Sequence, residues 1–332
     1  MEIEPQVLGE GAARFGLNGA ELQFLGGMDG AVYQTRQADK TFVLKLEPVL
    51  PDKLEAVREK FEFMAYLGDH GLQLASPIPS SQGNLVEIIS NKKGLFAATK
   101  ALKAPGRHVG ADNPEVWKPP FFRAWGRTMG RMHHLARRYP YWRRPPADRS
   151  GLDLDTAIQD WQMEHASFAQ SCPDEAVRQR WVELGEILKT LPVEREGFGL
   201  IHNDLHPWNF LYDQGALTVI DFDVCCYHWF ITDIAIAVYH ACWGEKAQRP
   251  ANCPAFARSF VEDFITGYLW EYDLDSFWLK KLPLFIRYRE MLLFSAFSNT
   301  WPEPRKDWQV LMLAQLRQQS LENTHSLAML FE

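Results

Sequence analysis

The chain has 332 residues, of which 46% are hydrophobic and 23% charged, with 21 Phe, 12 Trp and 10 Tyr. This length exceeds that of one average domain, and this composition is typical of folded globular proteins, which excludes disordered and fibrous classes. The net charge of -7 and the lack of long Lys or Arg runs disfavour nucleic acid as a partner.

The N-terminus and the cysteines predict a cytoplasmic protein without a membrane partner. Residues 1 to 16 lack the basic and apolar regions of a signal peptide, and no stretch reaches the roughly 20 apolar residues that span a bilayer. The five cysteines include no CxxC pair, so buried thiols are favoured over disulfides or a zinc site. Nothing in the sequence indicates the oligomeric state.

The first third of the chain predicts a small antiparallel sheet with one helix. Three strands are expected first, at residues 21 to 25, 31 to 36 and 41 to 46. Apolar residues spaced by three and four then predict a helix that begins near residue 52 and ends between 68 and 71. A hairpin at residues 85 to 102 completes this strand-rich unit, which Pro105 and Gly106 separate from the rest.

A glycine-rich loop joins the first two strands, with glycines at Gly26, Gly27 and Gly30. Lys45 lies on the third strand, on the face opposite Leu44 and Leu46, because side chains alternate along a strand. Each feature alone has an ordinary explanation, a hairpin turn for the loop and a solvated side chain for the lysine. Together they favour a phosphate-binding site.

After residue 105 the pattern is mainly helical. Amphipathic helices are predicted near residues 121 to 138, 153 to 170, 175 to 191, 255 to 271, 276 to 299 and 305 to 330. The exception is the segment 198 to 223, where two short apolar strands flank a turn at Gly215. A hairpin centred there places Asn209 opposite Asp221, with Asp204 on the loop just before.

These three side chains suit phosphoryl transfer. The amide of Asn209 and the carboxylate of Asp221 are oxygen ligands for Mg²⁺, while Asp204 accepts the proton of the attacking hydroxyl. Ordinary turn chemistry explains each residue singly but not their joint spacing. A hydrolase metal site made of His202, His206 and Asp204 is the alternative, and it is disfavoured because no further His or Cys cluster completes it.

A cation is also needed on the nucleotide phosphates, and Lys45 can supply it if a helix glutamate orients its ammonium group. Glu59 is the preferred partner because Phe63 and Tyr66 share its side of the helix, so that side is expected to face protein. Glu62 is the alternative.

With these residues the sequence resembles the aminoglycoside phosphotransferase and choline kinase group of protein-kinase-like small-molecule kinases. The matching pieces, in family order, are the glycine loop with Lys45, Glu59, the His202-x-Asp204-x4-Asn209 loop, Asp221-Phe222-Asp223, and Asp233-Ile234-Ala235. The glycine loop alone is a weak signal, whereas the spacing between the two aspartate motifs is specific.

The resemblance implies an α+β, bilobal protein-kinase-like fold, with residues 1–103 as a nucleotide-binding lobe and 104–332 as a helical lobe. It also implies ATP and Mg²⁺ as cofactors, adenine against the backbone near Lys100 and Leu102, and Asp233 as a brace for the catalytic loop. The segment between Asp221 and Asp233 is too short to dock a peptide, so a small-molecule acceptor is expected. The helices at 153 to 191 and after 255 would form its pocket.

The stretch 221–235 is more similar to homoserine-kinase-like relatives than to antibiotic kinases, so an amino alcohol such as homoserine is the leading acceptor. An aminoglycoside is the alternative, for which Glu271, Asp273 and Asp275 offer acidic side chains. A catalytically idle kinase-like binding or spore-coat protein is the rival from another class, and a protein serine is a third acceptor.

Arg287 and Arg289 lie on a predicted helix that is apolar almost all round. Buried arginines require partners. One hypothesis is that one of them binds an acidic group of the acceptor, and the alternative is that it pairs with an internal Asp or Glu.

Overall fold

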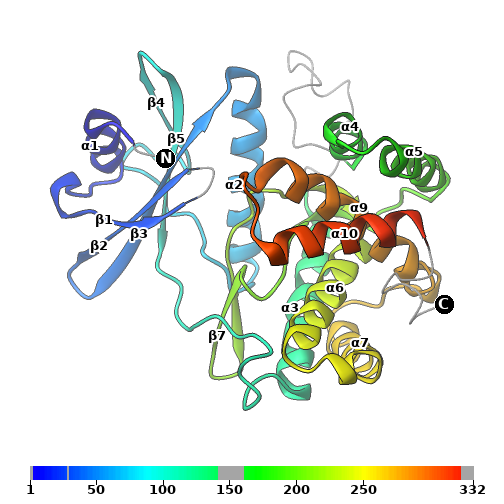
Figure 1. Cartoon of the computed structure of the whole chain (residues 1–332). Coiled ribbons are helices and arrows are strands. Elements are labelled where there is room, and N and C mark those ends of the chain that lie inside the picture. Colours follow the sequence, from blue (N-terminus) through cyan, green and yellow to red (C-terminus); the bar gives the residue numbers. More distant parts are fainter. Residues whose placement is uncertain (1–2, 28–29, 141–160, 323–332) are drawn as a thin grey trace. The chain divides into compact units, whose positions relative to one another are not determined.

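The computed structural model describes residues 3–27, 30–140 and 161–322 (Figure 1). The chain divides into two compact units, which we treat separately. The first is built mainly from Met1–Arg107 and Leu211–Asp221, and the second mainly from His108–Arg138, Gln159–Phe210 and Phe222–Glu332. The proposed division between residues 103 and 104 stays a prediction.

The first unit contains a five-stranded antiparallel sheet in the order β1-β2-β3-β5-β4. Its strands are β1 (Gln23–Gly26), β2 (Ala31–Gln37), β3 (Lys40–Val49), β4 (Glu87–Asn91) and β5 (Gly94–Leu102). The predicted alternation along β3 is confirmed, because Leu44 and Leu46 are fully buried and Lys45 points to the other face.

Two helices, not the predicted single one, accompany this sheet. The expected helix is α2 (Leu54–Asp69), which follows a 3₁₀ turn at Pro51–Lys53. The helix that the sequence analysis missed is α1 (Pro5–Arg14), whose Val7 and Ala12 are buried in one cluster with the sheet residues. It has only 10 residues and contains two glycines, which lower the helix propensity of the segment.

Residues 211–221 join the first unit through backbone pairing. They carry most of a hairpin of β7 (Phe210–Asp213) and β8 (Ala216–Val219), as predicted around Gly215. The amide of Ala75 donates to the carbonyl of Val219 at 2.9 Å. Arg107 and Tyr212 exchange backbone hydrogen bonds of 3.2 and 2.9 Å.

The second unit is mainly helical. Its helices are α3 (Pro119–Arg138), α4 (Trp161–Ser171), α5 (Glu175–Lys189), α6 (Phe230–Gln248), α7 (Cys253–Leu269), α8 (Ser276–Leu279), α9 (Leu282–Thr300) and α10 (Asp307–Leu321). A 3₁₀ turn lies at Pro250–Asn252, and another lies at Gly19–Glu21 in the first unit. The predictions for α3, α5 and α7 are confirmed within a few residues. The predicted helix 276 to 299 is divided into α8 and α9, and parts of two others, 153–160 and 323–330, lie outside the described residues.

The sequence analysis missed α6 and the strand before it, β9 (Cys226–Trp229), which pairs antiparallel with β6 (Phe198–Ile201). All four residues of β9 are buried, and α6 is buried along most of its length. An element that is apolar on every side has no polar face, so periodicity cannot distinguish it from a loop or a strand.

Among the described residues, no helix combines the length and the apolar character needed to cross a membrane. The cytoplasmic location and the lack of a nucleic-acid partner stay predictions.

A buried histidine in β9 should make stability depend on pH. His228 is fully buried, its Nδ1 accepts hydrogen bonds from Thr232 (2.6 Å) and the amide of Trp229 (2.9 Å), and burial lowers its pKa to about 3. The unfolded chain therefore binds a proton below about pH 6.5 that the folded chain excludes, and stability falls as the pH falls.

Between pH 7 and pH 5 this single site should remove about 2 kcal/mol of unfolding free energy. Urea denaturation at pH 7 and pH 5 measures the total change in unfolding free energy. In His228→Gln this change should be smaller than in the wild type by about 2 kcal/mol. The exposed His70→Gln is the matched control. An equal pH dependence in both variants would contradict this assignment.

Candidate active site

The predicted catalytic loop follows β6 directly and brings two of the predicted residues together. The side-chain Nδ2 of Asn209 donates to the backbone carbonyl of Asp204 at 2.9 Å and to its Oδ2 at 3.1 Å. Asn209 is buried, while Asp204 keeps a part of its carboxylate exposed. A carboxylate held at a protein surface beside an amide is suited to receive a substrate hydroxyl.

Asp233, near the start of α6, holds this loop through its backbone. It is fully buried, and its two carboxylate oxygens accept hydrogen bonds from the backbone amides of His202 (3.1 Å) and Asn203 (2.8 Å). Nε2 of His133 lies 3.1 Å from the same carboxylate, and its Nδ1 lies 2.8 Å from the hydroxyl of Tyr268. The predicted brace is therefore confirmed.

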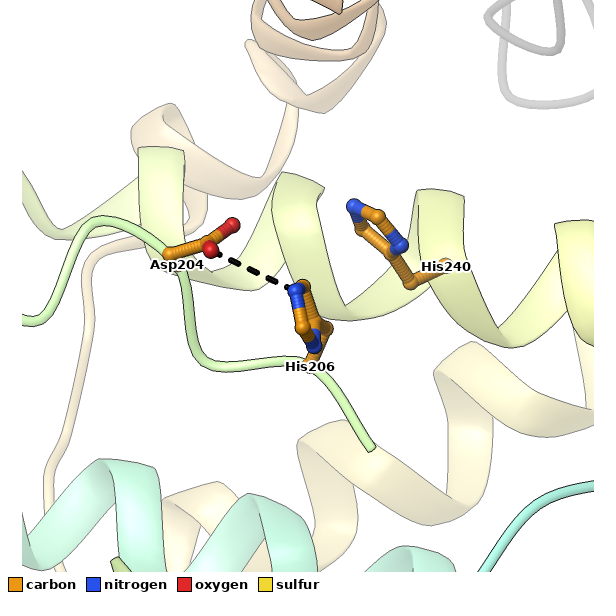
Figure 2. A group of neighbouring side chains, drawn as sticks. All are labelled: Asp204, His206 and His240. Atoms are coloured by element: carbon orange, nitrogen blue, oxygen red, sulfur yellow. Dashed lines mark ion pairs between the residues drawn. The ribbon is translucent and has the colours of Figure 1, made fainter. Parts of the chain in front are cut away.

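Arg289 of α9 contacts the other oxygen of Asp204. Its NH2 lies 2.5 Å from Oδ1 of Asp204. Nε2 of His206 lies 3.3 Å from Oδ2 of the same carboxylate (Figure 2). Burial would raise the pKa of Asp204, but the charge of Arg289 and the hydrogen bond with His206 outweigh it and hold this pKa well below its usual range. The alternative of an internal acidic partner is thus correct for Arg289, and that partner is the predicted base.

Asp204, His206 and His240 form a cluster whose ligand-type atoms all lie within 4.8 Å of one another. Figure 2 shows the carboxylate of Asp204 and the two imidazole rings facing one space, with His240 coming from α6. However, NH2 of Arg289 lies 2.9 Å from Nε2 of His240, so a guanidinium already bridges two of the three groups. His202, which the hydrolase alternative required, is fully buried and outside this cluster.

A cavity of about 820 Å³ opens beside Asp204, and all of its lining residues belong to the second unit. The predicted helices contribute through α4 and α9, and the missed helix α6 contributes a further wall. The polar part of the lining includes Glu164, Asn203, Asp204, His206, His240 and Arg289. The apolar part of the lining includes Phe168, Trp243, Leu292, Leu293, Ala296 and Phe297.

Glu164 of α4 is a site residue that the sequence analysis missed. Its carboxylate accepts hydrogen bonds from Nδ2 of Asn203 at 2.5 Å and from the hydroxyl of Tyr288 at 3.0 Å. Burial raises the pKa of this carboxyl, although the two hydrogen bonds oppose the rise. It lies well before the catalytic motif in sequence, so no local spacing could have revealed it.

In the first unit the glycine loop is too tight for side chains at two positions. Gly27 has φ of +134°, and a Cβ atom there would lie 2.1 Å from the carbonyl oxygen of Gly30. A Cβ atom on Gly30 would lie 2.6 Å from the backbone oxygen of Leu46. Gly26 ends β1 with φ of +142°. The loop thus needs glycine for its own backbone, and phosphate binding stays a prediction.

Lys45 has a partner on its own strand. Its Nζ lies 3.0 Å from Oε2 of Glu47, whose Oε1 lies 3.5 Å from Nζ of Lys60. Lys45 and Glu47 share a face of β3 because they are two residues apart, a signal that the sequence analysis did not use. The pairing of Lys45 with Glu59 or Glu62 stays a prediction.

The residues assigned to adenine lie at the end of β5. The carbonyl of Lys100 accepts from the amide of Ile78 at 2.7 Å, and its Nζ donates to the carbonyl of Phe15 at 3.0 Å. Burial lowers the pKa of Lys100. Leu102 is 43% exposed, so its side chain is free to contact a ligand. The adenine contacts stay predictions.

Asp221, the second predicted metal ligand, is exposed and has a left-handed backbone with φ of +64°. A positive φ is uncommon for residues other than glycine, and such residues occur often at functional sites. Its pairing with Asn209 around a metal stays a prediction.

Comparisons with known proteins identify the family. The sequence profile of the phosphotransferase enzyme family, APH, matches residues 21–278. The chain belongs to this phosphotransferase family. It is 31% identical over 329 residues to the amicoumacin kinase of Bacillus subtilis (strain 168), and the match covers 96% of this chain and 92% of that protein.

Comparison with solved structures agrees with this family assignment. An amicoumacin kinase in complex with AMP-PNP, Ca²⁺ and Ami superposes with a TM-score of 0.86 at 29% identity, covering 97% of this chain and 94% of the other. A microcompartment-associated aminopropanol kinase superposes with a TM-score of 0.74 over 98% of this chain and all of its own length, and at 17% identity it shows the fold alone.

The chain is therefore a phosphotransferase that acts on small molecules, with an α+β kinase-like fold, as predicted. The rival interpretation as a catalytically idle binding or spore-coat protein is not supported. The homoserine acceptor also finds no support in these relatives.

Proposed function

We propose that this phosphotransferase transfers the γ-phosphoryl group of ATP, with Mg²⁺, to a hydroxyl of a drug-sized antibiotic such as amicoumacin. The observation that carries the proposal is the cavity of about 820 Å³ beside Asp204. Pockets of roughly 300–1,000 Å³ enclose drug-sized ligands. The relatives that act on amicoumacin support the same acceptor class.

The size of the cavity argues against the amino alcohol that the sequence analysis favoured. A compound as small as homoserine would leave most of the cavity, including its apolar part, filled with water. Apolar walls contribute to affinity only when an apolar part of the ligand covers them. A larger acceptor with an apolar or aromatic portion uses the whole cavity.

Aromatic side chains favour such a portion. Trp243 and Phe297 contact each other with ring centroids 6.1 Å apart, and Trp208 is 68% exposed at the cavity beside His108. An exposed indole face offers an amphipathic ligand a large stacking surface. Near the base, the carboxylate of Glu164 can attract an amino group of the acceptor.

The antibiotic-kinase alternative of the sequence analysis is retained in this proposal, but the three acidic residues assigned to an aminoglycoside do not line the described cavity. Instead, Glu271 pairs with Arg127 at 2.7 Å, and Asp275 caps a helix by accepting from the amide of Phe277 at 2.7 Å. A wholly polar polycation also matches poorly with the apolar part of the cavity.

In the proposed mechanism Asp204 accepts a hydrogen bond from the acceptor hydroxyl, orients its oxygen toward the γ-phosphoryl group and takes up its proton as the new O–P bond forms and the bond to the leaving ADP breaks. Phosphoryl transfer depends on such positioning more than on strong bases, which suits a carboxylate with a depressed pKa. Lys45, oriented by Glu59, would contact the phosphates.

Asn209 and Asp221 would hold the metal. The amide of Asn209 uses Nδ2 for Asp204, so Oδ1 is the atom that it offers, and amide and carboxylate oxygens suit Mg²⁺. When bound, the metal neutralises charge on the phosphates.

A screen of acceptors tests the proposal. Amicoumacin, aminoglycosides, homoserine and other amino alcohols are each incubated with [γ-³²P]ATP and Mg²⁺, and transfer of label to the acceptor is measured. We expect kcat/KM to be highest for amicoumacin, by about tenfold or more, because only a large acceptor uses both parts of the cavity. Preference for homoserine would contradict the proposal.

A cavity-narrowing variant makes the test sharper. Ala296→Phe adds a ring to the apolar wall, so the KM of the large acceptor should rise while slow turnover of small amino alcohols is kept. Ala166→Phe on the exposed side of α4 is the matched control. Equal effects of both variants would indicate that the cavity is not the acceptor site.

A further inference from the structure

The Asp204 carboxylate is engaged on both of its oxygens. Oδ1 lies 2.5 Å from NH2 of Arg289, and Oδ2 accepts from Nδ2 of Asn209 at 3.1 Å and lies 3.3 Å from Nε2 of His206. Contacts from three groups to the two oxygens of a carboxylate restrict its side-chain rotamer. Its orientation is therefore determined by its neighbours.

Arg289 makes the shortest of these contacts, and it does so from a buried position. It lies on α9, whose Tyr288 and Glu290 are also buried, and only 9% of its side chain is exposed. Burying a guanidinium costs several kcal/mol unless charged or polar groups compensate it. Asp204 is its charged partner and Nε2 of His240, 2.9 Å away, is the second acceptor.

His240 can accept this hydrogen bond because it is neutral. Burial lowers its pKa well below the ordinary value, and the nearby charge of Arg289 lowers it further. Arg289 thus connects three elements of the second unit, α9, α6 and the catalytic loop.

We propose that Arg289 is a positioning residue for the transfer reaction, a resident cation that fixes the Asp204 carboxylate toward the acceptor hydroxyl. The inference rests on the proposed function only in taking Asp204 as the group that receives this hydroxyl. Arg289 replaces the metal ion that the Asp204, His206 and His240 cluster could otherwise hold. The guanidinium acts through Asp204 and is not itself the group that binds the acceptor.

Geometry explains why arginine is needed at this position. The planar guanidinium presents donors in fixed directions and keeps its charge throughout the physiological pH range. One NH2 group carries two N–H donors, so it can serve an oxygen and an imidazole nitrogen together. Lysine offers a point charge on a flexible stem, which can neutralise Asp204 without fixing its rotamer.

Steady-state kinetics of Arg289→Met and Arg289→Lys test the proposal. We expect Arg289→Met to lower kcat by about 10–100-fold, because a small displacement of a catalytic group has effects of this size. The KM values for ATP and acceptor should stay within about threefold. Arg289→Lys should fall between the wild type and Arg289→Met.

Arg287→Met is the matched control. It removes the other arginine of α9, and Arg287 is not among the residues that line the described cavity. Thermal unfolding of all variants separates misfolding from loss of turnover, and Arg289→Lys keeps the test valid if Arg289→Met is unstable. A raised acceptor KM with an unchanged kcat would show that Arg289 binds the acceptor and would overturn the proposal. Unchanged kinetics would overturn it too.

Two further measurements do not depend on the acceptor. Crystal structures of the wild type and Arg289→Met should show a rotated Asp204 carboxylate in the variant, and an unrotated one counts against positioning. Metal analysis of the purified wild type should find no transition metal at the cluster. A metal that is present and lost in His240→Ala would show that the cluster is a metal site. If the wild type phosphorylates no tested compound, the proposed function fails and these structures alone decide on Arg289.

Discussion

Asp204→Asn should retain ATP binding and lose about 10²–10⁴-fold in kcat, the usual contribution of a positioned general base. The amide cannot accept the hydroxyl proton, and its NH2 group would face donors, either NH2 of Arg289 or Nδ2 of Asn209. The acceptor hydroxyl would then lose both its partner and its orientation. Initial-rate kinetics with saturating ATP measure the loss, and fluorescence titration with ATP measures nucleotide affinity.

The substitution also removes the negative charge that compensates Arg289, so stability must be measured alongside activity. Assays are therefore run well below the melting temperature of the variant. Asp273→Asn, an exposed aspartate that does not line the cavity, is the control. Turnover within tenfold of the wild type would show that another group serves as the base.

Local sequence spacing was sufficient to predict that Asp204 and Asn209 come together. Asp204 and Asn209 are five residues apart, and a tight loop after a buried strand brings such residues together whatever surrounds it. The same holds for the β2-β3 hairpin with Lys45, because turn residues and alternation determine a strand pair locally.

The cavity around the loop could not be predicted in this way. Glu164, His240 and Arg289 come from three helices, and their meeting depends on how those helices pack. Helix packing is determined by the shapes of many side chains, for which no spacing rule exists. For α6 even the helix was missed, because its buried surface has no polar stripe.

The buried arginine was nevertheless informative from the sequence alone. Arg289 in an apolar helix required an acidic partner, and the alternative of an internal carboxylate is the one that the structure contains. Burying a charged side chain away from water costs free energy, so a charged residue in an apolar helix indicates a site even when its partner is unknown.

The size of the cavity, by contrast, could be found only from the folded chain. It changes the proposed acceptor from an amino alcohol to a larger compound.

Asp233→Ala should strongly destabilise the folded chain. It leaves the backbone amides of His202 and Asn203 and the imidazole of His133 without their acceptor in a fully buried place. Unpaired buried donors of this kind cost about 1–3 kcal/mol each, so we expect the free energy of unfolding to fall by about 3–5 kcal/mol. Urea denaturation at pH 7 measures it.

The same substitution should lower kcat even where the protein is folded. Asn203 has a left-handed backbone with φ of +64°, a conformation that the surrounding hydrogen bonds must maintain, and Asp204 follows it directly. Without Asp233 this residue can relax and move the Asp204 carboxylate away from Arg289. Asp263→Ala, which removes a carboxylate paired with the partly exposed Arg123, is the control and should cost about 1 kcal/mol or less. If Asp233→Ala is no more destabilising than Asp263→Ala, the loop is held by its own turn and not by α6.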